Sequence, residues 1–205
     1  VTDHHDIPYT EENGVRIYQK SCADAIVNPK QKECGYPFSG ICGAVVAFKV
    51  IQALYEKCGI PAKEAMEFLE NAAFATVGDV MDLTDENRII VKFGLERMRG
   101  TKNPGLRALI RQKEVLPERL SAYHLGFVLG PCVNAGGRLD TAARSLRLFL
   151  SESEADAALL AAELSDLNEE RKRMTADGVK EALLLISRER LDLQKVMVVY
   201  LPKLH

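Results

Sequence analysis

The stretch "GICGAVVAFKVIQALYEKCG", residues 40–59, gives the clearest structural signal in the chain. Its apolar side chains recur at intervals of three and four residues, as at Ile41, Val45 and Phe48, and this is the period of one face of an α-helix. Gly59 follows the last periodic residue, and glycine is common just past a helix C-terminus. The pattern therefore predicts a helix with one buried face.

The segments on either side of this helix predict the fold class. "ADAIVNP", residues 23–29, is typical of a short strand ended by Asn-Pro, and Val1 and Thr2 are interpreted as the end of another strand. "AKEAMEFLENAAFATVGDVMDL", residues 62–83, predicts a second helix, and Thr84 is the expected N-cap of a third. Strands followed by helices indicate a helix-rich α/β fold with a parallel sheet.

A long apolar stripe predicts one helix over residues 153–190, with Gly178 as its weak point. A continuous helix of this length reaches on the order of 55 Å, which suits a connector between domains. After it, "VMVVYLPKLH", residues 196–205, is a β-branched run typical of a buried parallel strand. Because neither terminus resembles a natural one, we expect the chain to be an excerpt of a longer enzyme, cut at both ends.

Composition limits the possible classes of protein. The chain has 205 residues and a net charge of -2, which excludes a uniformly basic nucleic-acid binder. Neither a membrane-spanning run nor a secretory leader is apparent, so we expect a cytoplasmic protein without a membrane partner. The five cysteines contain no C-x-x-C pair and are expected to be buried, reduced thiols rather than a zinc site.

One region is strongly basic. Residues 88–119 contain nine lysines and arginines against three glutamates. Two interpretations stay open, namely a surface for nucleic acid and a pair of solvated helix faces. The candidates for nucleic-acid binding in this region are Arg97, Arg99 and Lys102.

The opening "VTDHHD", residues 1–6, places Asp3, His4 and His5 just beyond the expected end of a strand. Open α/β sheets bind their ligands at that position. Mixed aspartate and histidine donors suit Mn²⁺, Fe²⁺ or Zn²⁺, and paired divalent ions are the usual means of hydrolysing phosphate esters. A His-His pair by itself is equally compatible with an exposed turn.

Two further motifs contain candidate site residues. Asp79 in "ATVGDVMDL" has apolar neighbours, so a buried carboxylate there would need a cation or hydrogen-bond donors. It is either a metal ligand or a helix cap or salt-bridge partner. "GPCVNAGGR", residues 130–138, combines a turn-forming Gly-Pro with Asn134, a double glycine and Arg138. The planar guanidinium of Arg138 suits phosphate oxygens.

Taken together, "TDHH", "ATVGDVMDL", "GPCVNAGGRLDTA" and "LNEER" resemble the DHH phosphoesterase superfamily. Within it, the chain is similar over essentially its whole length to the RecJ-like exonucleases, which are specific for single-stranded DNA. The resemblance implies a hydrolase with two Mn²⁺ or Mg²⁺ ions that removes nucleotides from the 5′ end in DNA repair and recombination. It also implies possible partners, a single-strand-binding protein or a helicase.

The resemblance assigns roles to individual residues. The implied metal ligands are Asp3, His4 and Asp79. His5 matches the second histidine of the motif, close to the metals and the scissile phosphate, and is the candidate catalytic residue. Asn134 and Arg138 match a motif that lines the nucleotide path.

The family pattern also contains parts that this chain does not show. An aspartate-rich D-x-D-x-D-G motif is expected upstream of the D-H-H, and a second domain of DHHA1 type is expected downstream. We therefore expect a partial DHH catalytic domain over residues 1–150, a connector helix over 151–192 and the first strand of a truncated DHHA1-like domain over 193–205. As an isolated piece it should bind metal weakly or not at all and be inactive.

Two alternatives stay open at this stage. One is a phosphodiesterase of the same superfamily that acts on short oligoribonucleotides or cyclic dinucleotides. The other is a non-catalytic nucleic-acid-binding or scaffold module. The extended basic stretch favours polymeric DNA over the first alternative, and the retained Asp-His-His set argues against the second.

Overall fold

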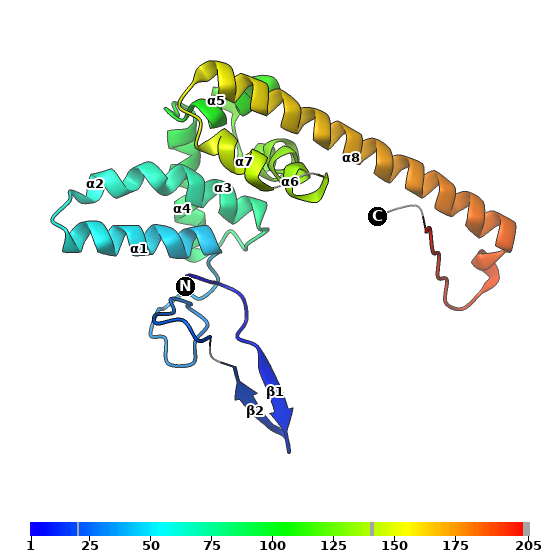
Figure 1. Ribbon diagram of the computed structural model, residues 1–205, viewed down its shortest axis with the longest axis horizontal. Helices are drawn as coiled ribbons and strands as arrows, with labels where there is room; N and C mark the ends of the chain where they lie inside the picture. The colour runs from blue at the N-terminus through cyan, green and yellow to red at the C-terminus, as the bar shows by residue number, and fades with distance from the viewer. Residues whose placement is uncertain (20, 140–141, 203–205) are drawn as a thin grey trace. The chain divides into compact units, whose positions relative to one another are not determined.

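The computed structural model describes residues 1–19, 21–139 and 142–202, with the side chains of Arg138 and Leu139 outside the description (Figure 1). Its elements in chain order are β1 (Tyr9–Glu12), β2 (Val15–Tyr18), α1 (Gly43–Lys57), α2 (Ala62–Ala65), η1 (Met66–Phe68), α3 (Leu69–Gly78), α4 (Asp85–Met98), α5 (Pro104–Gln112), η2 (Pro117–Arg119), η3 (His124–Leu129), α6 (Gly130–Leu139), α7 (Ala142–Phe149), α8 (Glu154–Glu189) and η4 (Leu191–Leu193). They form two compact units, the first containing Val1–Lys102 and Glu114–Gly130 and the second Asn103–Lys113 and Pro131–His205.

The core of the first unit is made of α3 with α1 and α4, both of which pack on α3. The helix predicted within residues 40–59 is confirmed as α1, and its apolar stripe buries Val45 and Phe48. The middle of α4 lies very close to α3, since a Cβ added at Gly94 would lie 2.2 Å from the Cβ of Ala73. Only a glycine at this position allows the two helices to approach so closely.

The helix predicted over residues 62–83 is divided and shorter than expected. A single turn of 3₁₀-helix, η1, separates α2 from α3. Helix α3 ends at Gly78 because Val80 takes a φ of +56°, in the left-handed region that terminates helices. Thr84 is the N-cap of α4 as predicted, although its side chain makes no capping hydrogen bond.

The strand pairing at the N-terminus is parallel, as predicted, but short. Thr2 and Val27 form an isolated parallel bridge, with the Asp3 N–H donating to the Val27 carbonyl at 3.0 Å. This pairing and the predominance of helices confirm the helix-rich α/β class. The hairpin β1–β2 was not predicted, and it turns through Asn13 and Gly14, both with positive φ.

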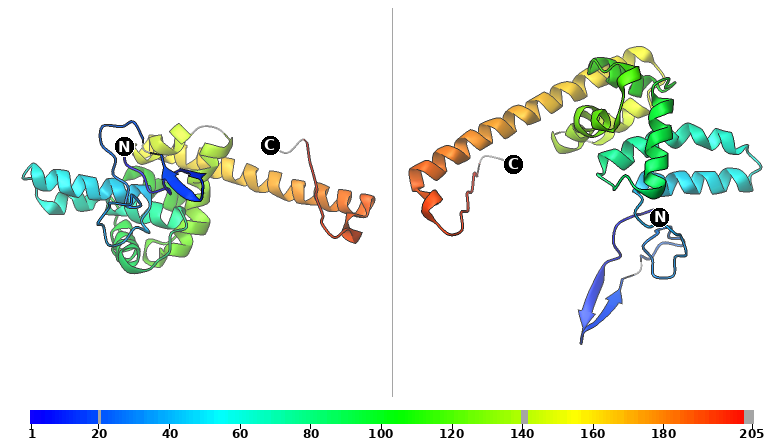
Figure 2. Two further views of the ribbon diagram at one scale, coloured as in Figure 1. Left: turned by 90° about the horizontal axis from the view of Figure 1, so that it is seen from below. Right: turned by 180° about the vertical axis from the view of Figure 1, so that it is seen from behind.

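The second unit is built around α8. The long predicted helix is confirmed, and Gly178 does not interrupt it. Helices α5 and α7 pack against its first half, where Ala161 and Leu164 are fully buried. Its second half extends beyond these neighbours, orange in Figure 2, and leaves Leu183 and Leu184 exposed.

Helix α5 packs along α8, so the two belong to the same compact unit. Residues 196–202 form no strand in the structure. A strand needs a hydrogen-bonded neighbour, and among the described residues nothing pairs with this segment, so Val196 and Tyr200 are largely exposed. The three predicted domains stay a prediction.

The turn expected at the start of "GPCVNAGGR" is wrong, because residues 130–139 form helix α6. Pro131 has no backbone N–H to donate to the preceding turn, and that turn is a π-helix, η3. The Gly130 N–H donates to the Leu125 carbonyl five residues back. A Cβ at Gly130 would lie 2.5 Å from that oxygen, so glycine is required there.

Two expectations from composition can be compared with the structure. All five cysteines are free, but only two are buried, and Cys22, Cys34 and Cys58 are exposed, so the expectation of buried thiols is wrong for these three. Cys22 and Cys34 lie outside any helix, and Cys58, which continues the apolar period of α1, is the residue at which that helix ends.

No helix in the described part of the chain is long and apolar enough to cross a membrane.

Candidate metal and nucleic-acid site

The strand end at Thr2 positions the Asp-His-His sequence. Beyond the bridge to Val27 the chain turns, and the Asp3 carboxylate bonds back to the residues that follow it. Its Oδ1 accepts the backbone N–H groups of His4 and His5 at 2.8 and 3.2 Å and lies 2.7 Å from the His5 Nδ1. The hydrogen bond to the His5 ring, followed by the two backbone bonds, lowers the pKa of Asp3 to about 2. The carboxylate is therefore ionised at neutral pH.

His4 points toward α3 and meets Asp79. The His4 Nε2 lies 3.3 Å from the Asp79 Oδ2, although the two residues are far apart in the sequence. Gly43, the first residue of α1, makes this approach possible, because a Cβ there would lie 3.3 Å from the His4 Cδ2. We call Asp3, His4, His5 and Asp79 the acid–histidine corner.

The environment of Asp79 differs from the one expected. Its side chain is 49% exposed rather than buried among apolar groups, because α3 ends there and the next residue, Val80, is 86% exposed. Val80 is β-branched and has positive φ, a conformation that costs energy. Such strained residues cluster at functional sites, and here the strain sits next to the candidate ligand.

Asn28 holds the loop that carries His5, a role that the sequence reasoning missed. Its side chain is almost fully buried, its Nδ2 donates to the His5 carbonyl at 3.0 Å, and its Oδ1 accepts the Lys30 N–H at 2.9 Å. The sequence places this asparagine at the end of a predicted strand, and Asn-Pro was interpreted only as the end of that strand. His5 itself is the most exposed side chain of the corner, at 77%.

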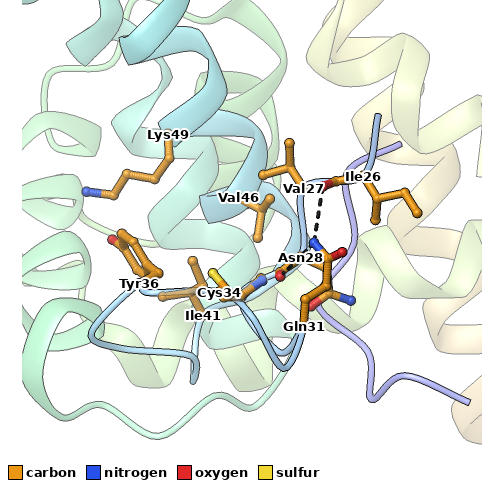
Figure 3. A pocket seen from close by; sticks show the side chains of 10 residues that line it. Ile26, Val27, Asn28, Gln31, Cys34, Tyr36, Ile41, Val46 and Lys49 are labelled. Carbon is orange, nitrogen blue, oxygen red and sulfur yellow. Dashed lines mark hydrogen bonds between the residues drawn. The ribbon is translucent and has the colours of Figure 1, made fainter. Parts of the chain in front are cut away.

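A mainly apolar pocket of about 220 Å³ lies beside Asn28, between the segment of residues 26–36 and the start of α1 (Figure 3). At its polar end the Tyr36 hydroxyl and the Lys49 ammonium both bond to Glu86. Burial, together with the nearby Glu86 carboxylate, raises the pKa of Tyr36. Burial opposes ionisation of Glu86, but the bonds from Lys49 and Tyr36 outweigh it and lower the pKa of Glu86.

The basic stretch divides into two groups with different surroundings. Arg107 forms an ion pair with Glu154, and Lys113 lies 3.3 Å from the Ser165 hydroxyl, so these cations support the packing of α5 on α8. In contrast, three cations at the end of α4 are exposed, namely Arg97, Arg99 and Lys102. The structure thus leaves these three candidates for nucleic-acid binding accessible.

The remaining candidates lie in the second unit. Asn134 is exposed on α6. Arg138 has a helical backbone, but its side chain lies outside the described residues. Asn134 and Arg138 thus belong to a different compact unit from the acid–histidine corner.

The donors of the corner suit a divalent cation. His4 offers an imidazole nitrogen and Asp79 a carboxylate oxygen at one point, and the ionised Asp3 lies next to His4. Mn²⁺ binds such mixed imidazole and carboxylate ligands, whereas Mg²⁺ requires mainly oxygen ligands. Within residues 1–19, 21–139 and 142–202, no group of three such side chains closes into a complete ligand set.

Fold and site together define a helix-rich α/β protein in which aspartate and histidine donors converge, and the comparisons with known proteins agree with this class. No protein-family model matches the chain. The chain is 38% identical, over 198 residues, to the single-stranded-DNA-specific exonuclease RecJ of Bacillus subtilis, an alignment that covers 97% of this chain and 23% of that protein.

Solved structures give the same result. A RecJ structure from Thermus thermophilus in complex with Mg²⁺ matches with a TM-score of 0.70 and 32% identity, over 77% of this chain and 24% of that one. A structure of exonuclease RecJ bound to manganese matches with a TM-score of 0.71 and 32% identity, over 78% of this chain and 40% of that one. The chain is thus similar to RecJ in sequence and fold, and the predicted resemblance is confirmed. It spans about a quarter of the length of the B. subtilis relative.

Proposed function

We propose that this chain carries part of the active site of a metal-dependent exonuclease that hydrolyses single-stranded DNA from its 5′ end. The observation that carries the proposal is the meeting of His4 and Asp79 at 3.3 Å, beside Asp3, in a chain similar to RecJ. We extend the proposal to the process and the place, which are DNA repair and recombination in the cytoplasm. A single-strand-binding protein or a helicase is the expected partner.

Asp3, His4 and Asp79 are the proposed ligands of Mn²⁺ or Mg²⁺, the ions named in the related RecJ structures. When bound, divalent ions supply Lewis-acid stabilisation of the phosphate charge. The protein's part is to hold the donors in place. The packing of His4 on Gly43 fixes the imidazole, and the three hydrogen bonds to Asp3 keep its carboxylate charged.

His5 is the proposed catalytic residue of the corner. Its ring lies 4.4 Å from that of His4, between centroids, and is open to solvent. Asp3 accepts a hydrogen bond from one ring nitrogen when that nitrogen is protonated, which orients the other nitrogen outward. When both ring nitrogens are protonated, the outer one can donate a hydrogen bond to a non-bridging phosphate oxygen, where charge develops during cleavage.

The DNA path is proposed to be lined by cations and amides beyond the corner. Arg97, Arg99 and Lys102 are exposed, so their charged groups can contact phosphates. Asn134 and Arg138 are included in the path on the basis of the motif that they share with the family. The two alternatives, a dinucleotide phosphodiesterase and a scaffold, explain less, because neither needs both the exposed cations and a convergent set of acid and imidazole donors.

The test uses the complete protein, as its gene encodes it, with single-stranded DNA labelled at either end in the presence of Mn²⁺. We expect mononucleotides to be released first from the 5′-labelled end, and chelation of the metal to stop the reaction. An oligoribonucleotide and a cyclic dinucleotide serve as competing substrates. Hydrolysis of either in preference to DNA, or digestion from the 3′ end, contradicts the proposal.

A further inference from the structure

We propose that Tyr123 and Phe127 form a stacking platform for a base of the single-stranded DNA, an inference that rests on the proposed function. Their rings are stacked on each other, with centroids 5.3 Å apart and planes inclined by 28°. Tyr123 is 63% exposed and Phe127 is 73% exposed. Both side chains are therefore accessible to a flat ligand, and the His124 ring also contacts Tyr123 edge-on, with centroids 5.7 Å apart.

Phe127 belongs to the π-helix η3 and Tyr123 immediately precedes it, and this helix has two distinct faces. Leu125 and Leu129 are fully buried on one face, and the two aromatic rings stand on the other. The buried leucines anchor the helix, so stability does not require the rings to be where they are. π-Helical turns are rare and often occur at functional sites. The arrangement thus presents aromatic surface on a rigid support.

The platform lies close to the acid–histidine corner within the first unit. Helix η3 packs against α3, and at Gly126 the two are close enough that an added Cβ would be in van der Waals contact, 3.4 Å, with a methyl group of Val77. Val77 is two residues before Asp79 on α3. The rings and the candidate metal ligand are therefore carried by two helices in direct contact, so a strand held by one can reach the other.

Charge next to the platform suits a nucleic acid. The Arg99 guanidinium donates to the Leu120 carbonyl at 3.5 Å, which places a cation at the turn that leads into Tyr123. Arg119, also exposed, precedes the same turn. Aromatic faces combined with cations are the usual means of binding single strands, because every base has a π-face and every linkage a phosphate. A duplex would not offer its base faces, so we infer a single-stranded ligand.

The experiment measures binding of a fluorescent oligo(dT) with phosphorothioate linkages to the complete protein by anisotropy. Tyr123→Ala and Phe127→Ala should each weaken binding by about 5- to 150-fold, the range for loss of one base–aromatic stack. Tyr123→Phe and Phe127→Trp keep a flat ring and should bind like the wild type. Phe93→Ala removes an exposed aromatic ring elsewhere in the first unit, on α4, and is the matched control.

An abasic oligomer with the same phosphates separates stacking from charge. The wild type should bind the abasic oligomer as weakly as the alanine variants bind oligo(dT). The alanine variants should bind the two oligomers equally well. Trp emission of Phe127→Trp should be quenched by oligo(dT) but not by the abasic oligomer. This readout does not depend on the alanine variants being stable.

The outcomes distinguish the two proposals. If the wild type binds oligo(dT) and the alanine variants bind it equally well, the platform is wrong while the exonuclease function stands. The same holds if Trp emission is unchanged by DNA. If the wild type binds no single-stranded DNA, the proposed function and the platform are both overturned.

Discussion

Helix α3 contains two regions that differ in what surrounds them. In its middle, Ala73 is fully buried against Gly94 of α4, where no atom can be added without displacing a neighbour. At its C-terminal end, Asp79 is half exposed and lies 3.3 Å from the His4 Nε2. One helix thus contributes to stability at its centre and to the candidate site at its end. Substitutions at the two places should therefore have opposite consequences.

The largest expected effect is at the helix end. In the complete protein, Asp79→Asn should reduce cleavage of single-stranded DNA by on the order of 10³-fold or more, because a metal ligand is lost. The metal-free melting temperature should stay the same or rise slightly, since repulsion between Asp79 and the ionised Asp3 is removed. Turnover assays and thermal melting measure the two effects.

Asp82→Asn is the matched control for this prediction, since Asp82 is an exposed acid three residues further on. It should change neither quantity. If Asp79 is only a helix cap or salt-bridge partner, its replacement should instead lower stability by about 0.5–2 kcal/mol and leave most of the activity.

The second effect concerns DNA affinity. Replacing Arg97, Arg99 and Lys102 together with Glu should weaken single-strand binding and reduce the slope of log K against log salt by about 2, at roughly 0.7 per phosphate contact. The measurement is a salt titration of oligomer binding. Lys63→Glu, an exposed cation on α2, should leave the slope unchanged. Equal slopes for the triple variant and the wild type would show that the three cations are merely solvated.

A third substitution tests the buried middle of α3. A Cβ at Gly94 would meet the Ala73 Cβ at 2.2 Å and the Leu69 carbonyl oxygen at 3.0 Å. Gly94→Ala should therefore lower the free energy of unfolding by about 1–3 kcal/mol through overpacking, with cleavage per folded molecule retained. Denaturant unfolding measures the loss. Gly100→Ala, where a Cβ meets nothing within 4 Å, is the control, and equal stability of both variants would refute the close packing.

The smallest effect is a pH dependence at the rim of the pocket. Because the folded protein lowers the pKa of Glu86 below its usual 4.5, its ion pair with Lys49 stabilises the fold above that pH and is lost as the pH falls through the lowered value. Wild-type stability should thus decline faster below pH 4.5 than that of Glu86→Gln. Parallel acid denaturation curves for the two proteins would contradict this.

The sequence predicted those parts of the fold that depend on local periodicity. The helices at residues 43–57 and 154–189 follow from apolar spacing, and Ser153 caps the second as a short polar residue should. The hairpin turn at Asn13-Gly14 had a recognisable signal that was not used. The π-helix η3 could not be predicted from the apolar periodicity. Its wide turn depends on the missing N–H of Pro131 and the absent side chain of Gly130.

The candidate site residues could be predicted from the sequence, but their tertiary environment could not. The meeting of His4 with Asp79 depends on the packing of α1 against α3 and on Gly43, and neither is local in the sequence. Asp79 was expected to be buried because its neighbours are apolar, but the left-handed Val80 ends the helix and exposes the carboxylate. Tertiary packing decides both features.

The central claim is that His4 and Asp79 bind the same metal ion, and calorimetric titration of Mn²⁺ into the complete protein tests it most directly. We expect His4→Ala and Asp79→Asn each to weaken the same site by about 10-fold or more, while Asp82→Asn binds like the wild type. The double variant should be little worse than either single one, because both residues serve one ion. Wild-type Mn²⁺ stoichiometry and affinity in Asp79→Asn would contradict the claim.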